Sequence, residues 1–330
     1  MTDLVPESDA YVPVVDLTPL YASNDDGRDE LARLIAHACR TVGFFVIRDH
    51  RVPEGIITRM LDAVEWFFGL PLAEKLALVG DPADPLQRGY IPLPQLQGGL
   101  IEPDLHEVFI YNRFGDPGTV LPDGAEPRLR LPNRMPDSAE FGAAVRGYYR
   151  ELERLAMDVM RLFARALALP ESWFDDKFDN HTTGLAANYY PPPGVAARNG
   201  PLRKAAHSDW GTLTVLYQDE NAGLQVLDPR GDWHDVPPRP GSFVVNIGEL
   251  MTRWTNNRWS STVHRVVSPD DAGRARYSLP FFHQPNCDAI IACIPTCTGD
   301  DHPPSHQPIP SFDYFSQKAR KARIARLARR

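Results

Sequence analysis

Apolar residues recur at helical spacing in three segments of the N-terminal half of the chain. One segment, residues 28–41, has its apolar positions at Leu31, Leu34, Ile35 and Ala38. A second apolar stripe follows Pro53, a residue that is favoured in the first turn of a helix. A third runs from Phe141 to Ala166 and predicts a long helix over about 138–168. These patterns predict a largely helical region with two short strands, at 12–18 and 44–48.

From about residue 183 the pattern changes to short apolar runs separated by Pro, Gly, Asn and Asp. The runs are LAANYY, TLTVLYQ, GLQVL, SFVVNI, TVHRVV and RYSLPFF. Many short strands with frequent turn residues are typical of a sandwich or barrel. Residues 76–137 show few clear periodicities and are predicted to be rich in loops, and a last helix is predicted from about 311. We expect one compact unit over 1–330, with a mainly helical region carrying edge strands (1–175), a β core (176–300) and a C-terminal basic helix (301–330).

Composition narrows the class of protein. Proline accounts for 32 of 330 residues, about twice its average share of roughly 5%, and such frequent prolines disfavour an all-helical bundle. No apolar stretch reaches the roughly 18 residues that a membrane helix needs, and the acidic start, MTDLVPESDAYVP, lacks the apolar core of an export signal. The four cysteines form no paired C-x-x-C sites. We therefore expect a cytoplasmic protein with reduced thiols and no membrane partner.

The net charge of −8 is unevenly distributed along the chain. The last thirteen residues, KARKARIARLARR, hold seven Lys or Arg and no acid, so the remainder of the chain is more acidic than the total indicates. This tail is interpreted as a solvated basic helix on an acidic body. A role in binding nucleic acid or lipid headgroups is the alternative, but an acidic body would repel phosphate, so we expect no nucleic-acid partner.

The candidate chemistry begins at His207 and Asp209 in the segment AAHSDWGTLT. Residues two apart on a strand point to the same side, so the imidazole and the carboxylate can converge on one ion. Such a pattern also arises by chance and carries little weight alone. A second histidine, His264, lies inside an apolar strand-like run, where a packed core histidine is the ordinary alternative. Two His and one carboxylate with open positions suit non-haem Fe(II) that activates O2.

Arg276 and Ser278 share one face of a further predicted strand. An inward-facing Arg in a β core is costly unless it meets an anion. A guanidinium fork and a hydroxyl form a good carboxylate receptor, although an ion pair with a protein acid is the structural alternative. Together with the His207, Asp209 and His264 set, the receptor predicts a site for a 2-oxo acid cosubstrate beside the iron.

Over roughly residues 12–290 the chain resembles the isopenicillin N synthase-like family of 2-oxoglutarate and Fe(II)-dependent oxygenases. The resemblance rests on the segments VPVVDLTPL, VGFFVIRDHRVP, FFGLPLAEK, NYYPP, HSDWGTLTVLYQDENAGLQV, DWHDVPPRPGSFVVNIGELMTRWTNNRWSSTVHRVV and RYSLPFFHQPN. It implies a mixed α and β fold, with a double-stranded β-helix (jelly roll) core and flanking helices. It also implies an enzyme that oxidises a small molecule by hydroxylation, desaturation or oxidative cyclisation and releases succinate and CO2.

The resemblance implies a role for each site residue. His207, Asp209 and His264 would ligate iron, Arg276, Ser278 and Tyr190 would hold the distal carboxylate of 2-oxoglutarate, and Asn188 would lie beside that cosubstrate. Phe282 is expected to face the substrate. Apart from the resemblance, the aromatic residues Trp210, Phe109, Tyr111 and Tyr90 are further candidate pocket walls, with packing in the core as the ordinary alternative for each.

Three alternatives stay open from the sequence. In an oxidase like isopenicillin N synthase itself, the Arg-x-Ser pair would hold the carboxylate of the substrate and no oxo acid would be needed. A non-catalytic metal-binding jelly roll and a nucleic-acid demethylase are the other two. The oligomeric state is expected to be a monomer or a weak homo-oligomer.

Overall fold

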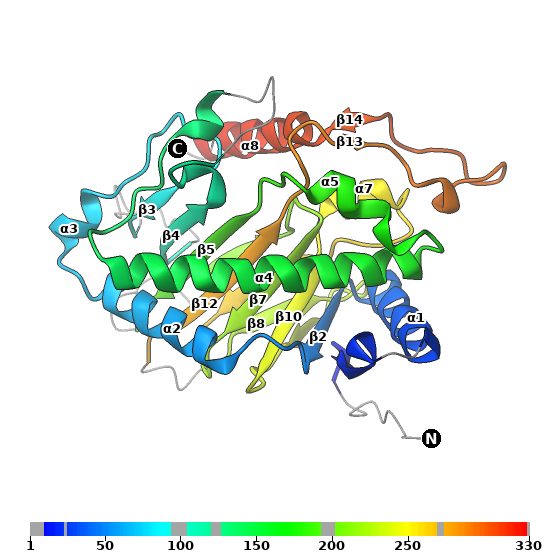
Figure 1. Cartoon of the computed structure of the whole chain (residues 1–330), viewed down its shortest axis with the longest axis horizontal. Coiled ribbons are helices and arrows are strands. Elements are labelled where there is room, and N and C mark those ends of the chain that lie inside the picture. Colours follow the sequence, from blue (N-terminus) through cyan, green and yellow to red (C-terminus); the bar gives the residue numbers. More distant parts are fainter. Residues whose placement is uncertain are drawn as a thin grey trace.

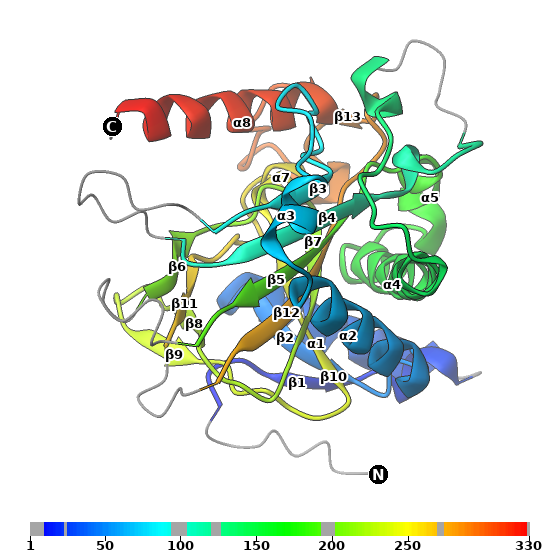
Figure 2. The ribbon, with the colours of Figure 1, turned by 90° about the vertical axis from the view of Figure 1, so that its left-hand side faces the viewer.

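Two sheets face each other, and helices cover the outer side of the larger one. The computed structural model describes residues 10–22, 25–93, 104–119, 127–192, 202–268 and 274–328. In the view of Figure 1 the long helix α4 crosses in front of the large sheet, with α1 and α2 beside it. Figure 2 shows the small sheet, β6, β11, β8 and β9, on the other side of the large sheet from α2 and α4. This is the predicted mixed α and β architecture with a jelly-roll core.

The large sheet has eight strands in the order β1-β2-β10-β7-β12-β5-β4-β3. The bounds are β1 Val14–Asp16, β2 Phe44–Arg48, β3 Gly89–Ile91, β4 Glu107–Asn112, β5 Gly184–Tyr190, β7 Leu213–Gln218, β10 Ser242–Ile247 and β12 Arg276–His283. Its four central strands come from the C-terminal half of the chain, and the N-terminal half supplies two strands at each edge. The segments predicted as strands at 12–18 and 44–48 contain β1 and β2, which lie at one of these edges.

The small sheet has four strands in the order β6-β11-β8-β9. The bounds are β6 Leu202–His207, β8 Leu224–Leu227, β9 Trp233–Asp235 and β11 His264–Val267. A further short pair is formed by β13 Ile290–Ile291 and β14 Ile309–Pro310. The valines and aromatic residues between the two sheets, among them Val226, Val244 and Phe44, form a separate core cluster.

The predicted helices form with small shifts of their ends. The bounds are α1 Asp25–Thr41, α2 Glu54–Phe68, α3 Leu72–Leu76, α4 Ala139–Ala166, α5 Asp175–Phe178, α7 Glu249–Trp254 and α8 Ser311–Ala328. Pro53 is the residue before α2 rather than its first helical residue. Ser138 caps the N-terminus of α4, where its hydroxyl accepts a hydrogen bond from the backbone N–H of Phe141.

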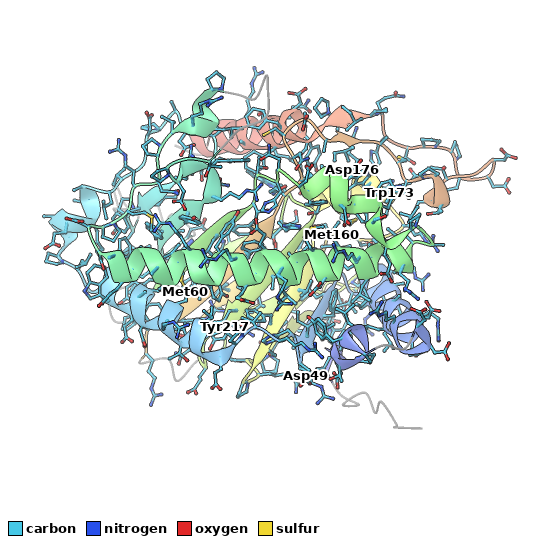
Figure 3. All side chains as sticks on the ribbon, viewed as in Figure 1. Asp49, Met60, Met160, Trp173, Asp176 and Tyr217 are labelled. Carbon is cyan, nitrogen blue, oxygen red and sulfur yellow. The ribbon has the colours of Figure 1, made fainter. Side chains whose placement is uncertain are left out.

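The main core lies between the helices and the large sheet. Met60 of α2 and Met160 of α4 are fully buried there, and Tyr217 of β7 packs against the same cluster (Figure 3). The prediction for residues 76–137 missed β3 and β4 in this layer. The segment EVFIYN of β4 carries polar residues at both ends, so its alternation is weak, and pairing with β5 along its whole length decides its structure.

Among the described residues, no helix is both long enough and apolar enough to span a bilayer. The basic tail forms the end of α8, and the side chains after residue 321 lie outside the described residues.

Candidate functional site

His207, Asp209 and His264 converge at one end of the space between the two sheets. Their ligand atoms all lie within 4.8 Å of one another. The Nε2 atom of His207 is 4.0 Å from Oδ1 of Asp209, and the Nε2 atom of His264 is 3.8 Å from the same oxygen. His207 ends β6 and His264 begins β11, and the two residues are paired across the sheet. The strand pairing therefore brings together two histidines that are far apart in the sequence.

Backbone carbonyls orient both imidazole rings. The Nδ1 atom of His207 is 2.7 Å from the carbonyl oxygen of Ala205, and Nδ1 of His264 is 3.2 Å from that of Thr262. A carbonyl can only accept, so each Nδ1 carries the proton and each Nε2 presents its lone pair toward Asp209. This is the tautomer that a metal ligand needs.

The Asp209 carboxylate is held by two neutral donors. Its Oδ2 atom accepts hydrogen bonds from the Thr214 hydroxyl at 2.6 Å and from the Asn246 amide at 2.8 Å, which leaves Oδ1 facing the histidines. Burial acts to raise the pKa of Asp209, but attraction to His264 and His207 in their protonated forms, together with these two hydrogen bonds, outweighs it and lowers the pKa. The carboxyl group is therefore ionised at neutral pH.

Burial keeps the two imidazoles neutral. It lowers the pKa of His207 to about 3, with the nearby charge of Lys204 as the next cause, and it also lowers the pKa of His264. Two neutral imidazoles and one ionised carboxylate on one face form a donor set for a divalent ion with coordination positions left open.

A second polar group lies in the same pocket, on β5 and β12. Arg276 is paired with Tyr190 across the two strands, and Ser278 with Asn188. The guanidinium carbon of Arg276 lies 5.1 Å from the centre of the Tyr190 ring, and the Asn188 amide donates a 3.2 Å hydrogen bond to the Ser278 hydroxyl. All four residues line the pocket and are buried.

Arg276 has spare capacity to bind an anion. Its Nε donates to the carbonyl oxygen of Asn221 at 3.1 Å, and one terminal nitrogen, Nη2, donates to Oε1 of Gln218 at 3.2 Å. The other terminal nitrogen, Nη1, is buried and has no hydrogen-bond partner in the part of the chain that the structure describes. Among the described residues no carboxylate forms an ion pair with Arg276, so the alternative of an ion pair with a protein acid is not observed. An unpartnered buried N–H is costly and fits a ligand carboxylate.

Two family models match this chain. The 2OG-Fe(II) oxygenase superfamily matches residues 182–285, and the N-terminal region described as non-haem dioxygenase in morphine synthesis matches residues 12–138. The 2-oxoglutarate-Fe(II) type oxidoreductase hxnY of Emericella nidulans is 35% identical over 309 residues, which cover 90% of this chain and 86% of that protein. The chain belongs to the 2-oxoglutarate and Fe(II)-dependent oxygenases. Their cofactor is Fe(II), and 2-oxoglutarate and O2 are their cosubstrates.

A further relative and a solved structure support this family assignment. The validamycin A dioxygenase of Streptomyces hygroscopicus subsp. limoneus is 32% identical over 297 residues, covering 87% of this chain and 80% of that protein. The crystal structure of a full-length Neurospora crassa protein in complex with alpha-KG and thymine superposes with a TM-score of 0.84 at 27% identity, covering 96% of this chain and 99% of the other. The oxygenase is thus an oxidoreductase with the predicted jelly-roll fold.

The predicted substrate-pocket residues separate into two groups. Phe282 lines the pocket beside the His207, Asp209 and His264 set. Tyr90, Phe109 and Tyr111 belong instead to the main core, so their placement as pocket walls is corrected: Phe109 packs on Phe67 of α2, and Tyr111 packs on Tyr149 of α4. Side chains alternate between the two faces of a strand, and the pairing of β4 in the sheet turns Phe109 and Tyr111 toward the helices.

Trp210 also lies outside the pocket lining, and it contacts the C-terminal helix. Its ring centre is 5.7 Å from that of Phe315 in α8. In the same place Glu249 accepts hydrogen bonds from Ser208 at 2.8 Å and Tyr314 at 3.2 Å and forms an ion pair with Lys318. The first turns of α8 are thereby attached to the loop that carries Asp209.

Sequence reasoning missed several pocket residues in this oxygenase. Thr214 and Asn246 are polar residues inside otherwise apolar strand segments. This departure from the apolar pattern could have indicated a polar site. Lys204 gave no such signal, because polar and apolar residues are mixed around it in the sequence. The apolar walls were also missed: Phe44, Leu216, Leu224, Val266 and Pro280.

Removing the Thr214 hydroxyl should weaken metal binding without removing a ligand. In Thr214→Val the side chain keeps its shape, but Oδ2 of Asp209 loses its 2.6 Å hydrogen bond. We expect the Fe(II) dissociation constant to rise about tenfold, the lower end of what loss of an outer-shell partner costs. Anaerobic Fe(II) titration measures it. Thr298→Val is the control, because that hydroxyl bonds the Pro295 carbonyl away from the pocket; equal affinities in both variants would contradict the expectation.

Proposed function

We propose that this oxygenase holds Fe(II) with His207, Asp209 and His264 and oxidises a small organic molecule in the pocket between its two sheets. The observation that supports the proposal is the presence of both polar groups in one pocket. The three metal-binding candidates lie at the edge of the small sheet and the adjoining loop, and the Arg276 and Ser278 receptor lines the same pocket from β12.

Different residues would bind the metal ion and the cosubstrate. Asp209 supplies a negative charge to the cation and is kept in place by Thr214 and Asn246. Arg276 and Ser278 would bind the distal carboxylate of 2-oxoglutarate, with Tyr190 and Asn188 beside them. The strands thus present two anchoring groups at opposite ends of the cosubstrate, which restricts its orientation before the substrate enters.

The apolar residues that line the pocket would limit the access of water. Phe44, Leu216, Leu224 and Phe282 surround the polar groups and limit the access of water to them. When bound, iron and 2-oxoglutarate supply the oxidising chemistry, in which O2 and the oxo acid yield succinate and CO2 while a C–H bond of the substrate is oxidised. Hydroxylation, desaturation and oxidative cyclisation all begin at such a bond, and the position of the substrate against Phe282 would select among them.

One anaerobic experiment tests this assignment. Adding Fe(II) and 2-oxoglutarate to the purified chain should produce the visible charge-transfer band of a chelated oxo acid, and admitting O2 should release succinate. Absence of the band together with absence of succinate would refute the proposed function. Succinate-independent oxidation of a carboxylate substrate would instead favour an oxidase resembling isopenicillin N synthase.

We further propose that the chain acts in the cytoplasm as one unit over 1–330, as a monomer or a weak homo-oligomer, without nucleic-acid or membrane partners. Four free thiols support a reducing compartment. The core shared by α4 and the large sheet supports a single unit. The acidic body and the pairing of Lys318 with Glu249 speak against a phosphate-binding tail. A salt-dependent gel shift with DNA or RNA would contradict this part of the proposal.

A further inference from the structure

A β-bulge directs Lys204 into the pocket. On β11, His264 and Val266 are two residues apart, and their partners on β6 are His207 and Lys204, which are three residues apart. Side chains alternate along a strand, so without the extra residue Lys204 would point to the opposite side from His207. The bulge reverses this, and both side chains line the pocket.

The ammonium group of Lys204 stands among apolar side chains near the metal-binding candidates. Leu216, Leu224 and Val266 line the same pocket, and Lys204 is half-buried there. Among the described residues no carboxylate, carbonyl or hydroxyl forms a hydrogen bond or ion pair with its Nζ, whereas Lys75, Lys177 and Lys318 each have a carboxylate partner. The bulge therefore holds a cation that has no counter-ion among the described residues, beside the proposed site for a metal cation.

The charges of the pocket favour an anionic ligand at Lys204. Given the proposed function, the positive charges of Fe(II) and Arg276 equal the negative charges of Asp209 and the dianionic cosubstrate. The ammonium group of Lys204 then adds one surplus positive charge to the pocket. A monoanionic substrate would neutralise it. The cosubstrate already has a receptor on β5 and β12 of the large sheet, whereas Lys204 projects from β6 of the small sheet.

We propose that Lys204 is a specificity-determining residue that binds the carboxylate of the substrate, so that the natural substrates are small carboxylic acids in their anionic form. This inference rests on the proposed function, because the charge balance assumes iron and 2-oxoglutarate in the pocket. The apolar walls around the ammonium group indicate a hydrophobic body attached to that carboxylate. A charge-assisted hydrogen bond in such a setting is about twice as strong as a neutral one.

Matched acids and amides test the inference without knowledge of the substrate. Benzoate, phenylacetate, cyclohexanecarboxylate and hexanoate, each beside its primary amide, are titrated calorimetrically into the anaerobic full chain loaded with Fe(II) and 2-oxoglutarate. The same titrations use Lys204→Met, which removes the charge, and Lys204→Arg, which keeps it. Arg59→Gln is the matched control, since it removes one exposed positive charge from α2, on the far side of the large sheet.

We expect at least one acid to bind about tenfold more tightly than its amide to the wild-type chain, the size of one charge-assisted hydrogen bond. The preference should vanish in Lys204→Met, persist in part in Lys204→Arg and be unchanged in Arg59→Gln. The 2-oxoglutarate affinity, read from the charge-transfer band, should be the same in all four proteins.

Two results would overturn the inference. One is that no acid is preferred over its amide by the wild-type chain. The other is that Lys204→Met weakens 2-oxoglutarate binding about tenfold and leaves the acid preference intact, which would assign the lysine to the cosubstrate. Failure of the proposed function is recognised separately, because the wild-type chain would then show no charge-transfer band before any acid is added.

Discussion

Arg276→Met is expected to weaken 2-oxoglutarate binding by roughly a hundredfold or more. Arg276 is only 1% exposed, and its Nη1 atom has no hydrogen-bond partner among the described residues. A bound carboxylate left without this group would be a buried charge without its counter-ion, which costs about 3 kcal/mol or more, or about two powers of ten in affinity. The charge-transfer band, titrated with 2-oxoglutarate under anaerobic conditions, measures the loss.

Two further variants make the Arg276 result interpretable. Arg276→Lys keeps the positive charge but not the planar fork, so its affinity should fall between those of wild type and Arg276→Met. Arg265→Met is the matched control: Arg265 is the neighbour of His264 on β11, but its guanidinium lies over the Trp233 ring, outside the pocket. If Arg276→Met binds 2-oxoglutarate as tightly as Arg265→Met, the proposed receptor is wrong.

Asp209→Ala is expected to abolish stable Fe(II) binding and, with it, succinate formation. The carboxylate is the only negative charge among the described residues that line the pocket. Its loss should cost more than the roughly 10- to 100-fold that removal of an outer-shell partner costs. Iron content per chain after anaerobic reconstitution and desalting measures the effect, and circular dichroism checks that the variant is folded.

Asp228→Asn is the control for the Asp209 experiment. Asp228 is also buried and also contacts a histidine, with 3.0 Å between its Oδ2 atom and Nε2 of His234, but it lies outside the pocket. Iron content should therefore stay at the wild-type level in Asp228→Asn. Full iron occupancy in Asp209→Ala would show that the ion binds elsewhere.

Contacts between α8 and Glu249 give part of the basic C-terminal segment a structural role. Lys318, at the start of the basic run, forms an ion pair with Glu249, and Glu249 also binds Ser208, the residue between His207 and Asp209. The helix is thus joined by one carboxylate to the segment that carries two of the candidate metal ligands, His207 and Asp209. The net charge of the chain could not have indicated this contact, because it gives the number of charged residues and not which of them form ion pairs.

Prediction from the sequence succeeded where the signal is local. The apolar stripe of α4, the apolar run of β10 and the H-x-D spacing each depend on residues within a few positions of one another, so a short stretch of sequence reports them directly. The aromatic residues of β3 and β4 show the limit. Tyr90, Phe109 and Tyr111 have the composition of pocket walls, but the pairing of β4 with β3 and β5 places them in the core beneath α2 and α4.

By itself, the sequence determined which chemistry the chain carries: two histidines, one carboxylate and an Arg-x-Ser pair in strand-like runs, on a scaffold of helices followed by β strands. Only the tertiary structure decided which residues stand beside that chemistry. The bulge in β6 that turns Lys204 inward and the alignment of Arg276 with Tyr190 both arise from register between strands that are distant in the chain. Register depends on the packing of whole sheets, and a shift of one residue reverses every side chain on a strand, so no local pattern could have specified it.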